Sequence, residues 1–533
     1  MPKNQERGIA LVLALFLMSA MSVLAASLMF LSQTETYASM NYRMMSQARY
    51  AGEAAVQKAS DFLLDSAQYA VPSATNAVDP LANFLRTSSP VRCAGGGCTV
   101  GQPIVLSATA SMASNYPASA VQTAFNAAAQ GSLAAGPITV NYGAYATLKA
   151  MQEFQAFGGT QNVVQIWEIT GVGSLAGSRP ATVEVVAIVE TPKVPANNYA
   201  AFATDDHCGA MTFAGSTESD SYDSRTLSGA TTPTDANGLL EADGGDVGTN
   251  GNLTISGGAV DINGNLYSPR SGVGECTAGA VTALTTSDIA TVSGSIVQLP
   301  TVVTYPAPTV PTPSLTAAVS LTAGGTTLTT CAALGLTPVV NCNVSGNTIT
   351  IQGTNIDGTP LKLPSLTLDN HVTLVLTATS GPAEFNFNSI TLEGGAEIKV
   401  AATATDQAVL VNIAGKNPDN SNIATPVDLV GGTFAAADVS GCASCSVYDA
   451  SMLQFVYGGA GEVKMAGHTG AAATIYAPNA AFTLEGTADL YGSILAKTVN
   501  IAGSANIHYD RRLAEDFYVM GRPMVGTFTW KRY

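Results

Sequence analysis

The chain has 533 residues, enough for two or three domains, and its 22 Lys and Arg against 38 Asp and Glu give a formal net charge of −16. Charged residues make up 11% of the chain, and Gly, Ala, Thr and Ser dominate its C-terminal two-thirds, which favours tightly turned β structure over helix bundles. Because no basic block offsets the acidic balance, the charge argues against nucleic-acid partners, whose phosphates require many Lys or Arg.

The first predicted element is a membrane-spanning helix. The stretch Ile9–Leu31 carries no charge and only three serines. At about 1.5 Å per residue it is roughly 35 Å long, enough to cross a bilayer. Lys3 and Arg7 precede it, which favours a cytoplasmic N-terminus. The alternative is a cleavable secretory signal, with Ala25 ending a VLA sequence of the cleavage type.

The residues after this span favour a membrane helix over a secretory signal. Apolar and small residues continue at spacings of three and four, which predicts one helix over residues 9–72 that runs past the membrane. The residues in this pattern are Tyr37, Met40, Met44, Ala48, Ala51, Ala55, Ala59 and Phe62. A signal peptide does not need such an amphipathic continuation.

Two stretches of this region carry a family resemblance. The sequences RGIALVLALFLMSAMSVLAASLMFLSQTE and ARYAGEAAVQKASDFLL resemble the N-terminal segment of PilX-type minor pilins and related pilus-assembly proteins. The resemblance implies that residues 1–8 are a leader ending at Gly8, which prepilin peptidase would remove by cutting before Ile9. It also implies a bacterial inner-membrane location before assembly, other pilins or minor pilins as partners of the helix, and a periplasmic or extracellular C-terminal domain.

One position departs from the pattern of major pilins. Major pilins carry a Glu five residues into the mature helix, where this chain has Leu13. A carboxylate in the bilayer is costly unless it meets a partner such as the N-terminal amine of a neighbouring subunit. The absence of that Glu favours a minor position in the filament and argues against a major-pilin role.

Residues 73–198 are predicted to form a separate small α/β unit that resembles the general pilin plan. The strands Val163–Thr170 and Ala181–Glu190 are expected to be joined by a turn that holds Gly171, Gly173 and Gly177. A phosphate-binding loop is a poor interpretation of these glycines, because their spacing is wrong, no Lys-Ser/Thr follows, and the next element is a strand.

The eight cysteines indicate disulfides formed outside the cytoplasm. We expect the bridges Cys93–Cys98, Cys208–Cys276 and Cys331–Cys342, and with less entropic gain the very short Cys442–Cys445. A zinc site at Cys442 and Cys445 is the alternative for the last couple, but a second couple at ligand spacing is missing.

A short repeat predicts the fold of the C-terminal part. The pattern apolar-x-apolar-x-Gly occurs at Leu253/Ile255/Gly257, Ile390/Leu392/Gly394, Val463/Met465/Gly467, Phe482/Leu484/Gly486 and Val499/Ile501/Gly503. The last three copies are 19 and then 17 residues apart. A fixed short period indicates a β-solenoid (β-helix), in which each rung buries its apolar residues against its neighbours. The alternative is a Gly/Thr-rich β-sandwich with similar hairpins.

The fold class is therefore mainly β: a long N-terminal transmembrane α-helix, a small α/β pilin-like unit, then a β-solenoid over residues 199–298 and 347–512, with a C-terminal tail at 513–533. Within the solenoid, Leu392 and Leu484 are expected to face the core, and Glu393 and Glu485 to face solvent.

The stretches GGDVGTNGNLTISGGAVDINGNLYS and IYAPNAAFTLEGTADLYGSILAKTVNIAGSANIHYD resemble the β-solenoid domains found behind PilX-type N-termini, and also bactofilin-like solenoids. This resemblance implies architecture more than activity.

Residues 299–346 interrupt the repeats. Their prolines predict an extended, semi-rigid stretch, and Cys331 and Cys342 would close a short loop. These prolines are Pro300, Pro306, Pro308, Pro311 and Pro313. An insertion on one face of a solenoid is a frequent place for binding an unknown surface ligand, and an unspecialised surface loop is the equal alternative.

The sequence predicts neither an enzyme nor a cofactor. The four histidines (His207, His371, His468 and His508) stand in no nucleophile or metalloprotease motif, and His508 is expected to be structural. Four acidic residues among glycines are weak calcium candidates, namely Asp220, Asp223, Asp243 and Asp246, although Asp also caps turns. A solenoid polysaccharide-active enzyme is the least favoured alternative, because it needs clustered carboxylates.

We therefore expect a non-enzymatic, pilin-like minor subunit of a type IV pilus or related secretion system. Its helix would anchor and assemble it, and its solenoid would project outward for structural or adhesive contacts. The alternative is a membrane-anchored solenoid surface protein or adhesin that never enters a filament.

Overall fold

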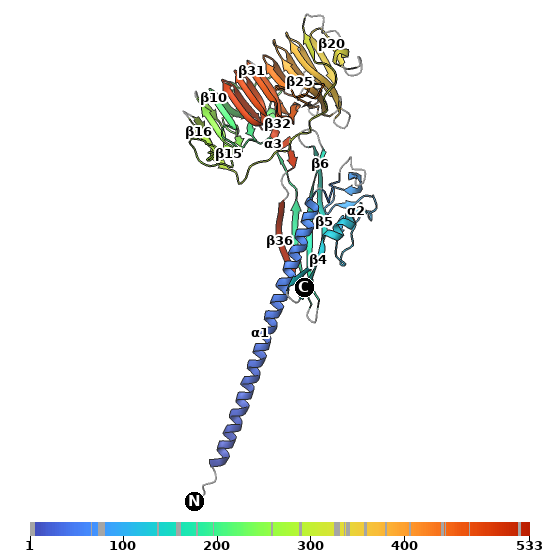
Figure 1. The fold of residues 1–533 in the computed structure, drawn as a ribbon, viewed down its shortest axis with the longest axis vertical. Helices are drawn as coiled ribbons and strands as arrows, with labels where there is room; N and C mark the ends of the chain where they lie inside the picture. The colour runs from blue at the N-terminus through green and yellow to red at the C-terminus, as the bar shows by residue number, and fades with distance from the viewer. Residues whose placement is uncertain are drawn as a thin grey trace. The chain divides into compact units, whose positions relative to one another are not determined.

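A computed structural model describes residues 6–532 except 66, 73–79, 136–137, 156–160, 177–179, 196, 257–258, 287–289, 324–330, 335, 337–341, 356–359, 379–380, 405–406, 439–441, 443, 468–469, 517 and 521–523. The chain forms two compact units (Figure 1). The helix–sheet unit comprises residues 1–154, 161–192 and 520–533, and the stack unit comprises residues 155–160 and 193–519.

The helix–sheet unit is organised around one long helix, α1 (Glu6–Leu64). Its sequence contains no proline and two glycines, Gly8 in the first turn and Gly52, so no proline interrupts the helical hydrogen bonds. The helix is shorter than the predicted span of 9–72. It ends at Leu64 because the Asp65 carboxylate accepts a hydrogen bond from the Ala67 backbone N–H at 2.9 Å and starts a turn instead.

The C-terminal third of α1 packs on a mostly antiparallel sheet with strand order β3-β5-β6-β7-β36, in which β4 also pairs with β5. The strands of this sheet are β3 (Val105–Ser107), β4 (Gln130–Ala135), β5 (Ile138–Gln155), β6 (Gln161–Leu175), β7 (Ala181–Glu190) and β36 (Met524–Arg532). The remaining elements are the 3₁₀ turn η1 (Leu81–Asn83), the small pair β1 (Phe84–Leu85) and β2 (Arg92–Cys93), and helix α2 (Ser119–Ala128). Helix α2 buries Phe125 against Phe62 of α1.

Two glycines that were predicted to lie in a turn belong to a strand. Gly171 and Gly173 lie inside β6, and Gly177 is outside the described residues. Both face α1 so closely that a Cβ atom on Gly173 would lie 1.9 Å from the Ala48 carbonyl oxygen. The glycines therefore allow the helix backbone to approach the sheet, which is why they do not mark the end of the strand.

The predicted C-terminal tail is also structured. Residues 513–533 contain α3 (Leu513–Asp516), β35 (Tyr518–Met520) and β36. β36 pairs antiparallel with β7, with Val525 opposite Val189, and so adds an edge strand to the first unit's sheet. The chain thus returns to the helix–sheet unit after leaving the stack unit, which periodicity alone does not reveal.

The stack unit is a coil of short, almost entirely parallel strands, which we name the coiled stack (β9–β34). The chain winds through three faces in turn, and each strand pairs with its counterpart one winding away. β9, β12, β15 and β18 lie on the first face, β10, β13 and β16 on the second, and β11, β14 and β17 on the third. The long strands β32 and β33 turn corners and contribute to all three faces.

The strands fall into two halves of the chain. The first half holds β9 (Ala201–Ala203), β10 (Met211–Gly215), β11 (Glu218–Tyr222), β12 (Val247–Thr249), β13 (Leu253–Ser256), β14 (Val260–Ile262), β15 (Leu266–Ser268), β16 (Leu284–Thr286), β17 (Ala290–Val292) and β18 (Ile296–Gln298). The second half holds β19 (Val319–Thr322), β20 (Cys342–Ser345), β21 (Thr348–Gln352), β22 (Thr354–Asn355), β23 (Leu361–Asp369), β24 (Thr373–Thr377), β25 (Ala383–Leu392), β26 (Glu397–Ala401), β27 (Val409–Ile413), β28 (Val427–Val430), β29 (Thr433–Asp438), β30 (Leu453–Tyr457), β31 (Glu462–Gly467), β32 (Gly470–Gly486), β33 (Asp489–Gly503) and β34 (Asn506–Asp510).

The chain enters this stack in its middle. β10 pairs with β13 on one side and with β33 on the other, and β11 likewise lies between β14 and β34. The winding that holds β9–β11 is thus sealed to the last winding along a contact that we name the seam. The first half grows from the seam to β18 at one end, and the second half begins with β19 at the opposite end (Figure 1).

The interior of the stack follows the alternation that the repeat predicts. Leu392 and Leu484 are fully buried, and Leu484 is in register with Met465 and Ile501 of the neighbouring windings. Glu393 is exposed and Glu485 is partly exposed. Gly394, Gly467, Gly486 and Gly503, which end four of the predicted repeats, have positive φ, and Gly257, which ends the fifth, lies outside the described residues. Gly467, Gly486 and Gly503 stack on one another at one corner, and Gly215 stacks on Gly503.

Candidate functional site

Among the described residues, exposed large apolar side chains are concentrated on the first two-thirds of α1. Ile9 is 66% exposed and Phe16 is 76% exposed, and the helix is the one among the described residues that is long and apolar enough to cross a membrane. Leu13 is also exposed at the position where major pilins carry Glu. Gly8 lies in the same helix directly before Ile9, so the two predicted processing residues are adjacent to the apolar surface.

The helix changes character at Ala48. From that residue onward, small side chains at spacings of three and four are completely buried against β6 and β7, including Ala51, Ala55 and Ala59. Tyr37 and Met40, which belong to the same predicted pattern, remain about half exposed. The same spacing of apolar and small residues therefore continues through an exposed part of the helix and a buried part.

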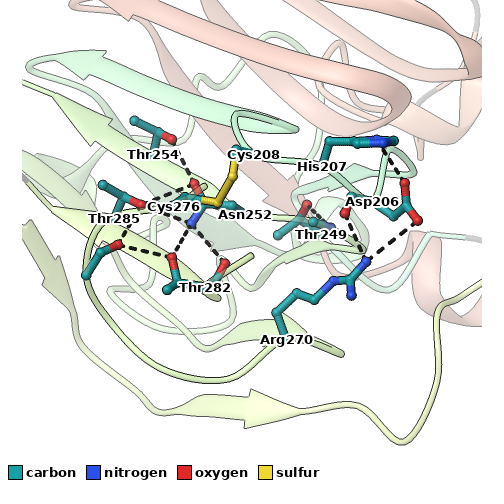
Figure 2. Close-up of a disulfide and its surroundings, with 12 residues drawn as sticks. Asp206, His207, Cys208, Thr249, Asn252, Thr254, Arg270, Cys276, Thr282 and Thr285 are labelled. Atoms are coloured by element: carbon teal, nitrogen blue, oxygen red, sulfur yellow. Dashed lines mark hydrogen bonds and ion pairs between the residues drawn. A yellow bond between two sulfur atoms is a disulfide. The ribbon is translucent and has the colours of Figure 1, made fainter. Parts of the chain in front are cut away.

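The eight cysteines form four disulfides in the pairs that the sequence predicts: Cys93–Cys98, Cys208–Cys276, Cys331–Cys342 and Cys442–Cys445. Cys208–Cys276 joins the loop between β9 and β10 to the loop between β15 and β16, and thereby ties two windings together across the winding of β12 and β13 that lies between them (Figure 2). The bond at Cys442–Cys445 replaces the alternative zinc interpretation, because these thiols are bonded to each other.

A carboxylate–imidazole group that the sequence analysis missed lies beside this disulfide. The ligand-type atoms of Asp205, Asp206 and His207 lie within 4.8 Å of one another. His207 Nδ1 is 2.9 Å from Asp206 Oδ1, and an Arg270 guanidinium nitrogen is 3.6 Å from Asp206 Oδ2 (Figure 2). Asp206 also lines a cleft of about 270 Å³ beside Thr304 and Asn479. The Arg270 guanidinium therefore offsets the charge of one of the two carboxylates.

The four weak calcium candidates do not assemble among the described residues into a metal-binding group. Asp223 caps a 3₁₀ turn by accepting from the Arg225 backbone N–H at 3.0 Å, and the hydrogen-bonded guanidinium of Arg225 lowers the pKa of Asp223. Asp246 accepts from the Asn265 backbone N–H at 2.6 Å. Asp243 contributes its backbone carbonyl to Ser221 Oγ. Asp223 therefore caps its own turn, which was the alternative to calcium, whereas Asp246 bonds the neighbouring winding at Asn265.

The fourth candidate, Asp220, belongs to a buried polar network at the seam. Asp220 Oδ1 is 2.6 Å from His508 Nδ1, and these two residues are register partners of β11 and β34 although 288 residues separate them. The ring of Tyr491 packs on His508 at 4.5 Å between centroids. His508 was expected to be structural, and its location differs from an ordinary strand end because a buried carboxylate binds it.

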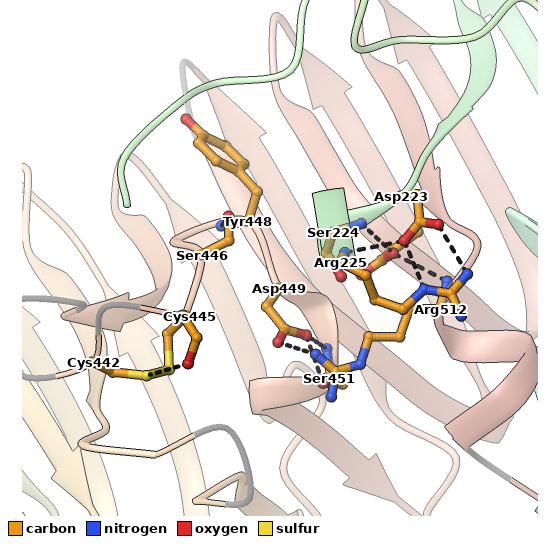
Figure 3. A network of polar contacts seen from close by, with 12 residues as sticks. Asp223, Ser224, Arg225, Cys442, Cys445, Ser446, Tyr448, Asp449, Ser451 and Arg512 are labelled. Atoms are coloured by element: carbon orange, nitrogen blue, oxygen red, sulfur yellow. Dashed lines mark hydrogen bonds and ion pairs between the residues drawn. A yellow bond between two sulfur atoms is a disulfide. The ribbon is translucent and has the colours of Figure 1, made fainter. Parts of the chain in front are cut away.

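Two more carboxylates extend this network. Asp510 is fully buried and accepts from the Ser224 backbone N–H at 3.1 Å, and burial raises the pKa of Asp510 to about 7. Asp449 Oδ2 accepts from Arg512 Nη1 at 2.5 Å, and Asp449 Oδ1 accepts from Ser451 (Figure 3). The network joins both halves of the chain, so its side chains stabilise the seam.

The proline-rich stretch also has a definite place. Residues 299–318 connect opposite ends of the coiled stack and are bonded along its first face. The Asn250 side chain bonds both the N–H and the carbonyl of Val303 at 2.8 Å, and Asn388 bonds Ser314 in the same two-way manner. Tyr476 donates its hydroxyl to the Pro306 carbonyl at 2.7 Å. The predicted insertion is thus, over this part, a strap and not a free binding loop.

Comparisons with known proteins match two separate segments. The family described as PilX N-terminal matches residues 7–57, and a domain of unknown function, DUF7305, matches residues 341–516. The N-terminal segment is pilin-like. The crystal structure of the competence-associated pilin ComZ from Thermus thermophilus is 14% identical, with 92% of this chain and 98% of that chain covered at a TM-score of 0.23. No curated protein matches.

Proposed function

We propose that the chain is a non-enzymatic, pilin-like minor subunit of a type IV pilus or related secretion system. The helix α1 would anchor it in the bacterial inner membrane and then pack against other pilins. The coiled stack, which we class as a β-solenoid, would project into the periplasm or outside the cell. Its likeness to bactofilin-like solenoids stays a prediction.

One observation carries this proposal. The PilX N-terminal match at residues 7–57 covers both the exposed apolar stretch of α1 and the start of its buried stretch at Ala48. An apolar helix surface that the chain itself leaves uncovered needs lipid or other helices as its surroundings. The buried stretch fixes the same helix to a folded domain, so a force on the helix would be transmitted to that domain.

Processing of the N-terminus tests the proposal. We expect the mature protein to begin at Ile9, because the resemblance places the prepilin peptidase cut after Gly8. Replacing Gly8 with Phe should leave the full-length precursor in the membrane, whereas Ala25→Phe should be processed normally. N-terminal sequencing of the membrane fraction reads both variants. A mature N-terminus at Ala26, lost in Ala25→Phe, would instead establish a secretory signal and reject the proposal.

A second candidate is a membrane-anchored surface protein that does not enter a filament. Leu13 fits this candidate as well as it fits a minor subunit, because in both cases the chain does without the carboxylate that would pair with a neighbouring subunit's amine. Mechanical shearing of cells separates the two candidates. A minor subunit is expected in the sheared filament fraction, and an anchored adhesin is expected to stay with the membranes.

A further inference from the structure

Buried polar side chains follow one another along a corner of the coiled stack, beside the seam. Thr474 of β32 is in register with Ser493 of β33. β33 and β34 pair in parallel up to Tyr491 and His508. Ser493 and Asp510 each follow two positions later, so Asp510 lies one winding beyond Ser493 at the same corner. Neighbouring windings are about 4.8 Å apart, which brings these side chains within reach of one small bound species.

Ser224 belongs to the same group, because its backbone N–H donates to Asp510 Oδ1 at 3.1 Å. We name Thr474, Ser493, Asp510 and Ser224 the polar corner. All four residues are at most 4% exposed. Within the part of the chain that the structure describes, Asp510 Oδ2 and the three hydroxyl oxygens have no hydrogen-bond partner. Such atoms are costly to bury singly, so four of them at one corner indicate a site for a ligand that oxygen atoms bind.

The charges around the polar corner leave the Asp510 carboxylate unneutralised. Asp449 accepts from Arg512 Nη1 at 2.5 Å, so this acid and this base offset each other (Figure 3). Tyr222, the register partner of Asp510, donates its hydroxyl to the Tyr448 carbonyl at 2.6 Å and not to the carboxylate. Among the described residues, the donors to Asp510 are the backbone N–H groups of Ser224 and Arg512, and both bond Oδ1. An ionised Asp510 therefore places a single negative charge in a buried site.

We propose that the polar corner binds a monovalent cation, Na⁺ or K⁺, between its carboxylate and its three hydroxyl oxygens. Oxygen atoms are the ligands that hard cations prefer. A single positive charge neutralises the carboxylate, whereas Ca²⁺ would leave a buried positive charge and requires about six to eight oxygen ligands. Ordered waters would satisfy the hydroxyls but would leave the buried charge in place.

The place of the site gives the cation a structural consequence. Ser224 follows β11 in the first half of the stack, and the other three ligands lie on β32, β33 and β34 in the second half. β11 and β34 are the strands that pair at the seam. A cation that binds only the closed seam stabilises it by mass action, independently of how the N-terminus is processed.

Hydrogen exchange of β34 in the purified full-length protein, in detergent at pH 8, tests the proposal. This pH lies above the pKa of about 7 to which burial raises Asp510. Exchange in NaCl and in KCl is compared at equal ionic strength with exchange in choline chloride, whose cation is too large for a buried site. We expect one of the two small cations to slow exchange by about tenfold, the effect of a ligand at roughly ten times its dissociation constant.

One pair of variants shows whether this protection requires the buried carboxylate. Asp510→Asn removes the charge and should abolish the difference between the salts. Asp261→Asn removes an exposed carboxylate on the same face and should retain the difference. Protection that persists in Asp510→Asn would be a general salt effect and would overturn the proposal.

A second pair of variants tests the hydroxyl ligands. Thr474→Val removes one proposed ligand and leaves the charge, so the cation concentration for half-maximal protection should rise by about threefold or more. Thr217→Val is the control, because Thr217 is also a buried threonine without a hydrogen-bond partner in the described structure, but lies directly before β11. Equal exchange of the wild type in all three salts would overturn the proposal in favour of ordered water. Protection by CaCl₂ and not by NaCl or KCl would overturn the assignment of a monovalent cation.

Discussion

Two contacts between neighbouring windings of the stack are built differently. Between β31 and β32, which nearly follow each other in the chain, apolar residues such as Met465 and Leu484 fill the interior, and the outward Lys464 lies partly in solvent. Between β11 and β34, at the seam, the outward side chains Asp220 and His508 are buried as well. An ordinary winding therefore needs one apolar face, whereas the seam adds specific polar pairs on its outer side.

The difference shows what allows a winding to pair specifically with a winding that is distant in the sequence. Consecutive windings are joined by short connections, so the entropy lost in pairing them is small. The seam joins strands that are 288 residues apart, and apolar alternation by itself fits any winding equally well. A buried carboxylate–imidazole pair is satisfied in one register, which favours the correct neighbour over other windings.

The largest effect is expected from disrupting the apolar contact between the consecutive windings of β31 and β32. Replacing Leu484 with Asp places an unpaired carboxylate in the interior and should cost on the order of 3–5 kcal/mol. Because each winding supports its neighbours, hydrogen exchange should accelerate in β31, β32 and β33 together. Unchanged exchange in these strands would mean that the interior does not hold the windings together.

The second prediction concerns pH at the seam. Because the folded-state pKa of Asp510 is raised to about 7 from 3.8, its stabilising protonation is complete below pH 4 and is lost as the pH rises through 7. Asp510→Asn keeps an acceptor for the Ser224 N–H and should stabilise the seam at pH 8 relative to wild type, by about 4 kcal/mol at about 1.4 kcal/mol per pKa unit. Hydrogen exchange of β34 at pH 5 and 8 measures this, and an identical difference at both values contradicts it.

The third prediction separates the seam pair from surface charge. Asp220→Ala removes the carboxylate that His508 Nδ1 contacts and should cost about 1–3 kcal/mol, because a buried polar group loses its partner. Asp261→Ala is the control, since this carboxylate is exposed on the same face. We expect faster proteolytic cleavage within β11 and within β34 in Asp220→Ala, and no such change in Asp261→Ala. Equal behaviour of the two variants would show that the buried pair does not stabilise the seam.

The smallest effect is expected on the outer side of the ordinary contact. Glu485→Gln should change stability by less than about 0.5 kcal/mol, because this side chain is 44% exposed and its ion pair with Lys464 is long. Urea unfolding followed by tryptic cleavage after Lys464 of β31 and Lys497 of β33, the basic residues that flank β32, gives the comparison with Leu484→Asp. Similar losses in both variants would remove the distinction between inside and outside on which the contrast with the seam rests.

Local patterns in the sequence were sufficient for the elements whose causes are local. The apolar run after Ile9 and the spacing of Ala51, Ala55 and Ala59 predicted α1, and the alternation around Leu484 predicted which side chains are buried. Three disulfides followed from couples of cysteines close in the sequence, and Cys208–Cys276, which are 68 residues apart, followed because these two cysteines were left over. A sixth copy of the repeat, Met211/Phe213/Gly215, was present in the sequence and could have been found by the same pattern.

Tertiary structure alone decided how these elements are arranged. Apolar alternation predicts which side of a strand faces the interior, but it does not predict which strand lies beside it. The pairing of β10 with β33 therefore could not be predicted from the sequence. The same limit hid the role of Asp220, whose partner His508 is brought close only when the seam forms. It also hid the function of Gly173, which depends on the approach of Ala48. Local patterns specify which side chains are buried, and only the folded tertiary structure determines which of the buried residues contact one another.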